Sequence, residues 1–170
     1  YKLTFEVYRD CSSGVVVGFD GTQSGNPNTQ LPPFYFSIFE GNVNNNIAYS
    51  YNELTNPKIE EIRPVIVNPC LRVDKNTCVE RGVYTTEVTL PRSDIGYTIQ
   101  HMRCCRNDGI LNIKNQPGSS DKPGFTLRTY IPPSNTTPNS SARFTELPPI
   151  FICENQTFYF DHSATDKDGD

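Results

Sequence analysis

Six cysteines constrain this chain more than any other feature of its sequence. Their number is even, no Cys-x-x-Cys pair occurs, and only two histidines are present to help bind a zinc ion. A structural zinc site normally takes four cysteine or histidine ligands from closely spaced pairs. The sequence therefore favours disulfide bonds, which persist outside the reducing cytosol. The residues predicted to form them are Cys11, Cys70, Cys78, Cys104, Cys105 and Cys153.

The pairing of these cysteines is only partly constrained by their positions. Cys70 and Cys78 bracket a short polar stretch, so a local Cys70–Cys78 loop is the first pairing that we predict. Cys104 and Cys105 are adjacent on a predicted strand, so their side chains should point to opposite faces and anchor two separate bridges. Cys11 and Cys153 are then the remaining partners, in an order that the sequence leaves open. A zinc site built from Cys70, Cys78 and the Cys104–Cys105 doublet is the alternative.

Alternating apolar and polar residues indicate β-strands along the whole chain. In residues 1–8, Tyr1, Leu3, Phe5 and Val7 would face one side and the intervening residues the other. The other predicted strands are 15–17, 34–39, 62–67, 83–90, 97–103, 125–131, 150–153 and 157–160, and 41–56 is predicted as turn and loop. We expect 83–90 and 97–103 to form a hairpin around the turn at 92–96.

No segment keeps a helical period for three turns, and Gly and Pro supply 25 of the 170 residues. The predicted fold is an all-β, immunoglobulin-like β-sandwich with long loops, stapled by disulfides. Residues 1–150 would form this module. Residues 151–170 would be a linker and the first strand of a following immunoglobulin-like repeat, because the chain begins inside a strand pattern and ends within an acidic run.

Charge and hydropathy exclude two classes of partner. The net charge is −4, and charged residues are mixed along the chain without a basic stripe, so we expect no binding to nucleic acid. No apolar run approaches the roughly 18 residues that cross a bilayer, so we expect no membrane insertion by this segment.

Catalytic signatures are weak, and the sequence predicts that the chain is not an enzyme. Asp161, His162 and Ser163 contain the residue types of a hydrolytic triad, but triads assemble in space, and neighbours on a strand point apart. No Gly-x-Ser-x-Gly nucleophile elbow occurs in the chain.

The acidic run at the end of the chain is the sharpest site signal. Asp166, Asp168 and Asp170 alternate around Gly169, and Asp161 lies shortly before them. Carboxylates spaced in this way let several oxygens converge on a hard cation, which is what Ca²⁺ requires. The sequence thus predicts a Ca²⁺ site, and the alternative is a solvated acidic turn.

A series of short motifs resembles a known type of module. These are Val7-Tyr-Arg-Asp-Cys11, Asn68-Pro-Cys70, Cys78-Val-Glu80, Val83-Tyr84, Leu90-Pro91, Arg103-Cys-Cys-Arg-Asn107 and Phe160-Asp-His-Ser-Ala-Thr-Asp166. In this order they resemble a module of very large cell-surface proteins of Bacteroidota that the type IX secretion system exports. One departure is Pro138, where many such modules carry a cysteine, and it leaves the partner of Cys153 open.

The resemblance implies a segment of a long adhesin or surface filament used for gliding, attachment or cell capture. The last of these motifs would open the next PKD- or cadherin-like repeat. Expected partners are neighbouring repeats of the same chain, other copies in a filament or bundle, and a surface glycan or a prey or host cell. The expected location is the bacterial cell surface. Two alternatives remain: a carbohydrate-binding module with exposed Phe34, Tyr49 or Tyr51 stacking on sugar, and an accessory domain of a secreted hydrolase.

Overall fold

The structure is a computed structural model that describes residues 1–11, 16–17, 23–24, 33–43, 48–63, 70, 77–103, 124–136, 139–149 and 151–169. These residues form strands and no α-helix. The strands are β1 (Lys2–Asp10), β2 (Val16–Val17), β3 (Gln23–Ser24), β4 (Phe34–Glu40), β5 (Ser50–Leu54), β6 (Lys58–Ile62), β7 (Val79–Glu87), β8 (Tyr97–Arg103), β9 (Phe125–Ile131), β10 (Arg143–Phe144) and β11 (Ala164–Thr165).

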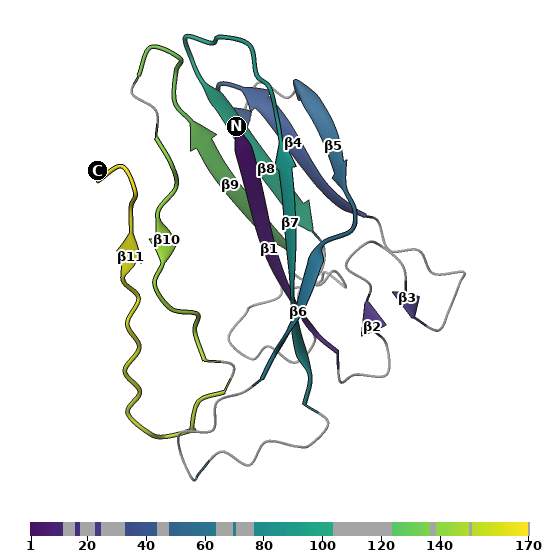
Figure 1. The fold of residues 1–170 in the computed structure, drawn as a ribbon, viewed down its shortest axis with the longest axis vertical. Helices are drawn as coiled ribbons and strands as arrows, with labels where there is room; N and C mark the ends of the chain where they lie inside the picture. The colour runs from purple at the N-terminus through teal and green to yellow at the C-terminus, as the bar shows by residue number, and fades with distance from the viewer. Residues whose placement is uncertain are drawn as a thin grey trace, which may run out of the picture.

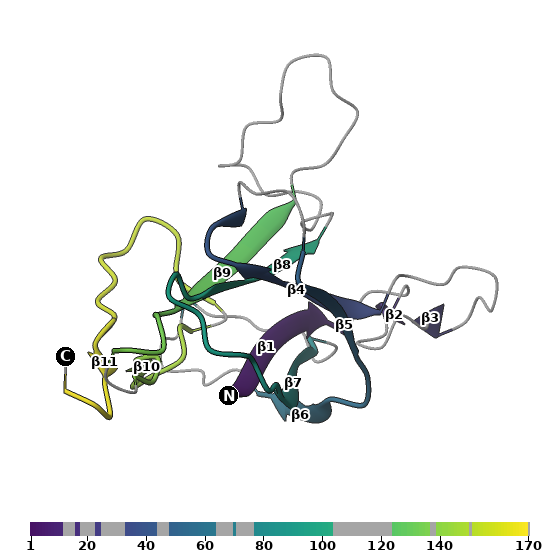
Figure 2. The same cartoon turned by 90° about the horizontal axis from the view of Figure 1, so that it is seen from above.

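Two antiparallel sheets form the body of the molecule. One has the strand order β1–β7–β6 and the other β5–β4–β8–β9. The two sheets lie as separate layers when the molecule is seen from above (Figure 2). Two small pairs, β2–β3 and β10–β11, lie outside these layers (Figure 1). The prediction of an all-β, disulfide-stapled sandwich is confirmed.

The strand order matches that of immunoglobulin-like domains. If β1 is named strand B, the pairs β1–β7 and β7–β6 correspond to B–E and E–D of one sheet. The pairs β4–β8, β8–β9 and β4–β5 correspond to C–F, F–G and C–C′ of the other. The described residues contain no strand at position A. They do contain a tyrosine corner, because Tyr97 at the start of β8 donates its hydroxyl hydrogen to the Pro91 carbonyl at 3.1 Å.

Aromatic side chains from both sheets meet in the core. Phe34 of β4 is 2% exposed, and its ring centroid lies 5.1 Å from that of Phe5 on β1 and 4.9 Å from that of Tyr84 on β7. The alternation within β4 places Phe36 and Ile38 in the same buried layer. On β1, Leu3, Phe5 and Val7 pack against this core, as their alternation predicted. Burial of apolar area on these faces is the main force that holds the two sheets together.

The predicted hairpin between 83–90 and 97–103 is wrong. β7 pairs with β1 and β6, whereas β8 pairs with β4 and β9, so the chain crosses from one sheet to the other at residues 88–96. Val88 and Leu90 pack on the core during this crossing. Ser93 exchanges hydrogen bonds with Ser134, which follows β9, at 3.0 Å in both directions. These hydrogen bonds pair the amide and the carbonyl of Ser93, which would otherwise need water as their partner.

Other strand boundaries also differ from the sequence predictions. Strand β5 lies within 41–56, which was predicted as loop, and it forms because its polar residues pair with β4. Strand β6 ends where the predicted strand 62–67 would begin, and residues 64–69 lie outside the described part. Residues 151–153 and 157–160 are not strands; β10 and β11 pair instead. The expected domain boundary near residue 150 falls between β10 and β11.

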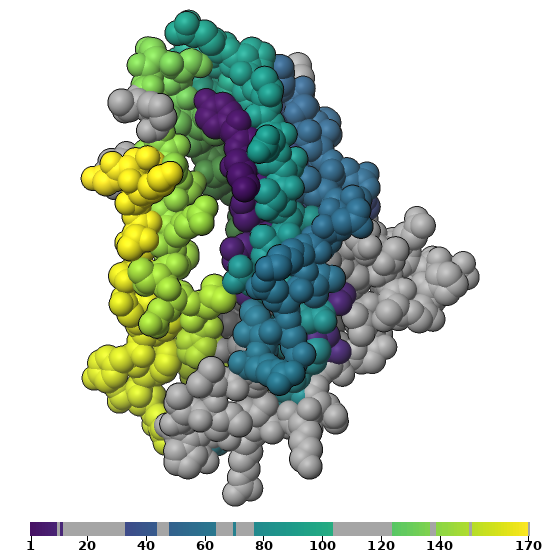
Figure 3. Space-filling model, viewed as in Figure 1, coloured from purple at the N-terminus to yellow at the C-terminus, as the bar shows by residue number. Residues whose placement is uncertain are grey.

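The segment that follows β9 runs beside the sandwich. Residues 139–149 and 151–169 form an extended arm that turns back on itself and carries β10 and β11 (Figure 1). Figure 3 shows an opening between this arm and β1. The arm makes only a short ladder, in which Arg143 lies opposite Thr165 and Phe144 opposite Ala164.

The corner before β8 gives a test of the fold. Gly96 has φ +70°, and a Cβ atom there would lie 2.3 Å from the Ile131 carbonyl oxygen. We expect Gly96→Ala to lower the free energy of unfolding by at least about 1–3 kcal/mol, because a left-handed backbone and a clash with a fixed backbone atom combine. Urea unfolding measures this loss.

Gly169→Ala is the matched control, because Gly169 also has a positive φ but a Cβ atom added there would meet nothing within 4 Å. It should cost clearly less. Equal losses in the two variants would contradict the close packing of Gly96 against β9.

Candidate functional site

Two disulfides join strand ends and a distant segment. Cys11 and Cys78 extend the β1–β7 ladder by one step beyond the Asp10–Val79 pair, with Cα atoms 4.9 Å apart. The Cys11 amide also donates to the Cys78 carbonyl at 2.9 Å. Cys70 and Cys153 form the second bridge, with Cα atoms 6.3 Å apart, and so tie the arm after β9 to the stretch between β6 and β7.

The predicted Cys70–Cys78 pairing is therefore wrong, and Cys11 and Cys153 do not pair with Cys104 or Cys105. The physical reason is register: the antiparallel pairing of β1 with β7 places Cys11 opposite Cys78, although 67 residues separate them in sequence. Alternation along each strand could not show which strands lie side by side. Cys104 and Cys105 lie outside the described residues.

The two bridges indicate an oxidising compartment, either extracellular or periplasmic, because disulfides rarely persist in the cytosol. Within the described ranges, no helix has the length and apolar character needed to cross a membrane.

Three of the four predicted calcium ligands accept a hydrogen bond from a backbone amide. Asp161 accepts a hydrogen bond from the Ser163 amide at 2.8 Å, and Asp166 accepts one from the Asp168 amide at 2.7 Å. Asp168 accepts from the Ser140 amide at 2.5 Å and so links the segment before β10 to the segment after β11. Asp170 lies outside the described residues.

The described carboxylates of Asp161, Asp166 and Asp168 are not gathered into one site. In the part of the chain that the structure describes, the only group of three potential metal ligands within 4.8 Å is Cys11, Cys78 and Glu80. Both of its sulfur atoms are in a disulfide, which removes them as thiolate ligands. The calcium site stays a prediction from the acidic spacing.

The residues that suggested a triad lie on the exposed arm. The His162 ring meets the ring of Phe160 edge-on at 4.6 Å, and the Ser163 hydroxyl lies 2.9 Å from that of Thr145. Asp161 accepts from the backbone of Ser163 instead of orienting the imidazole. In a catalytic triad, the carboxylate orients the imidazole and the imidazole contacts the nucleophilic hydroxyl. These three side chains do not form that chain of hydrogen bonds.

The other histidine, His101, belongs to the core. It is 3% exposed, and its ring stacks on that of Phe34 with centroids 3.9 Å apart. Its Nδ1 atom lies 2.6 Å from the Tyr35 carbonyl, which can only accept, so Nδ1 carries the hydrogen. The buried Nε2 atom has no hydrogen-bond partner among the described residues. Burial lowers the pKa of His101, and the charge of Arg103 adds to this effect, while the bond to Tyr35 opposes it.

This environment predicts a pH dependence of stability. The folded state holds His101 neutral, whereas the unfolded chain binds a proton near its ordinary pKa of about 6.5. Stability should therefore be fully present above about pH 6.5 and fall as the pH drops towards the lowered folded pKa, by at most about 1.4 kcal/mol per pH unit. Urea unfolding between pH 5 and 8 measures the slope.

The His101→Phe variant should lose much of this slope, whereas His162→Ala should keep it, because His162 is exposed. A slope that survives His101→Phe unchanged would assign the pH dependence to other groups.

An exposed face of the four-stranded sheet carries a row of polar and aromatic side chains. Register places Ser37 of β4 opposite both Tyr51 of β5 and Gln100 of β8, and Gln100 opposite Arg128 of β9. The Arg128 Nε donates to the Gln100 Oε1 at 2.5 Å, which fixes both long side chains on this face.

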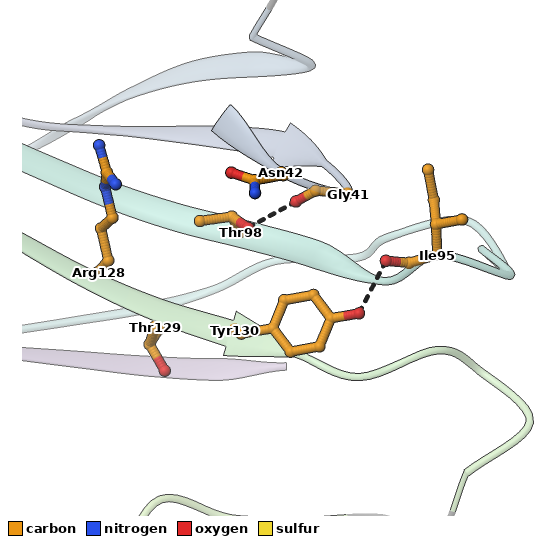
Figure 4. A pocket seen from close by; sticks show the side chains of 7 residues that line it. All are labelled: Gly41, Asn42, Ile95, Thr98, Arg128, Thr129 and Tyr130. Carbon is orange, nitrogen blue, oxygen red and sulfur yellow. Dashed lines mark hydrogen bonds between the residues drawn. The ribbon is translucent and has the colours of Figure 1, made fainter. Parts of the chain in front are cut away.

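One end of this face is hollowed into an open groove of about 660 Å³ (Figure 4). Thr98 donates to the Gly41 carbonyl at 2.5 Å, and the Tyr130 hydroxyl donates to the Ile95 carbonyl at 2.8 Å across its rim. The described lining residues include no carboxylate, histidine or cysteine; they are Gly41, Asn42, Ile95, Thr98, Arg128, Thr129 and Tyr130. Such a groove can offer hydroxyl, amide and guanidinium hydrogen bonds to a ligand.

The aromatic residues proposed from sequence to stack on sugar differ in their exposure to solvent. Phe34 is in the core, so the expectation that it stacks on a ligand is wrong; the alternation of β4 buries Phe34, Phe36 and Ile38. Tyr51 is 76% exposed on the open face. Tyr49 is half exposed, and its ring meets that of Tyr97 edge-on at 5.9 Å.

Sequence reasoning did not find Tyr35, Gln100 or Arg128. Tyr35, which is 44% exposed, alternates with Phe34 and Phe36, so the strand period alone could have placed it outward. The pairing of Gln100 with Arg128 had no local signal, because it depends on β8 lying beside β9.

Comparison of the chain with models of protein families, with curated proteins and with solved structures found no match.

Proposed function

We propose that this chain is a structural and adhesive segment of a very large protein on a bacterial cell surface, used for attachment, gliding or cell capture. The proposal combines the resemblance of its cysteine-containing motifs with an extracytoplasmic, disulfide-stapled sandwich. Its neighbours would be further repeats of the same chain, and copies could associate into a filament. Ca²⁺ bound by the acidic run would stiffen the junction with the next repeat.

The placement of the cross-links carries this proposal. Both described disulfides lie at strand ends or on the extended arm, and neither borders the groove on the four-stranded sheet. Cross-links in such positions secure the path of the chain instead of shaping a reaction site. Among the described residues, the lining side chains of the groove include no carboxylate, histidine, lysine or cysteine.

A surface role predicts accessibility on living cells. Treating intact producing cells with a protease should remove this segment, and deleting the region that encodes residues 1–170 in frame should reduce attachment in a flow chamber. An antibody against the chain, applied to protease-treated intact cells and to protease-treated lysed cells, measures whether the segment is accessible from outside. A segment that resists the protease until the cells are opened, together with unchanged attachment, would contradict the proposal.

Carbohydrate binding is a second candidate, favoured by an outward tyrosine on each of the neighbouring strands β4 and β5. Tyr35 lies opposite Glu53 and Tyr51 opposite Ser37, so the two rings start from diagonal positions on neighbouring strands. Tyrosine offers a rigid apolar ring with a polar tip, which suits the apolar faces and hydroxyls of sugar rings. Gln100 and Arg128, fixed by their mutual hydrogen bond, would supply further polar contacts.

A glycan array tests this candidate. If glycans bind, Tyr51→Ala should weaken binding at least about tenfold, corresponding to about 1.4 kcal/mol. Tyr159→Ala is a matched control, because Tyr159 is also highly exposed but lies on the arm. An array without signal, or equal losses in both variants, would remove this candidate.

A further inference from the structure

The two described disulfides create a short covalent route through the chain. From Tyr1 it follows residues 1–11, crosses the Cys11–Cys78 bond, returns along 78–70, crosses the Cys70–Cys153 bond and continues along 153–170. This route contains 38 of the 170 residues.

This route bypasses two long stretches of the chain. Residues 12–69 contain β4, β5 and β6, and residues 79–152 contain β7, β8, β9 and β10. Every strand of the four-stranded sheet, and every described residue that lines the groove, therefore belongs to one of these bypassed stretches. Cys104 and Cys105 also fall within 79–152, so a bond between them would leave the route unchanged.

The route begins with a strand that has little length to gain. β1 is already extended and is paired with β7 over all nine of its residues. The Cys11–Cys78 bond at the end of this ladder prevents β1 from sliding to another register. The last part of the route, residues 153–169, is also drawn out along the outside of the sandwich (Figure 1).

We propose that residues 1–11, 70–78 and 153–170, joined by the two disulfides, form a strap that carries tension between the ends of this segment. The proposal rests on the mechanical role suggested above. Force favours unfolding in proportion to the length that unfolding releases. Once the strap is taut, unfolding of residues 12–69 or 79–152 releases no length between the ends. Tension would therefore not favour loss of the four-stranded sheet, and its exposed face and groove would remain formed on a loaded chain.

Single-molecule stretching of the oxidised chain between residues 1 and 170 tests the strap. At about 3.5 Å per residue, its 38 residues limit the extension to about 130 Å. With reductant present, all 170 residues become available and the limit rises to about 600 Å. An oxidised chain that extends beyond about 300 Å would overturn the proposal.

Two double variants distinguish the bridges. Without Cys11–Cys78, in Cys11→Ser with Cys78→Ser, the shortest route follows 1–70 and 153–170, which is 88 residues or about 310 Å. Without Cys70–Cys153, in Cys70→Ser with Cys153→Ser, it follows 1–11 and 78–170, which is 104 residues or about 360 Å.

Each variant serves as the control for the other, because each retains one bridge. If either double variant extends no further than the oxidised parent, the bridge that it lacks is not part of the strap and the proposal fails. These lengths are measured on the isolated chain. If the isolated chain extends as expected but deletion of the segment leaves cell attachment unchanged, only the adhesive role is rejected.

Discussion

The stacking of Phe34 against aromatic rings of both sheets is the interaction on which the rest of this structure depends. Phe34 extends from β4 and contacts the rings of Phe5, Tyr84 and His101, so one side chain joins strands of the two layers. Because β4 alternates, burying Phe34 also decides that Tyr35 points outward. The same cluster keeps His101 neutral by removing it from water. The packing of the core and the composition of the exposed face are thus two consequences of one strand orientation.

The position of the disulfides separates this sandwich from antibody domains. There, a bridge between strands B and F crosses the core, and its second cysteine lies two residues after the corner tyrosine. Here the corner tyrosine is Tyr97, and the residue two positions later is Ile99, which is buried. Apolar packing therefore holds the two sheets together at this point. The described bridges lie at the periphery, where they cross-link segments that are distant in the sequence.

The crossing at residues 88–96 connects these two features. It carries the chain from the sheet that contains β1 to the sheet with the exposed groove, and its Tyr97 and Ser93 hydrogen bonds hold it against the end of the sandwich. Gly96 lies so close to the Ile131 carbonyl that no side chain fits between β8 and β9 at this point. The groove beside it is therefore formed by a corner of the sandwich, on the part of the chain that the disulfide route bypasses.

The sequence by itself determined the all-β class, the oxidised state of the four described cysteines and the strands with a clear alternation. The predicted bounds of 97–103 and 125–131 agree with β8 and β9, because period-two burial is encoded within each strand. The tertiary structure alone decided which strands are neighbours, and hence the crossing in place of a hairpin, β5 beside β4, and the Cys11–Cys78 and Cys70–Cys153 pairs. The physical reason is that alternation specifies which side of a strand is buried but carries no information about the strand beside it. Pairing is selected by the packing of the whole core, with Phe34 at its centre.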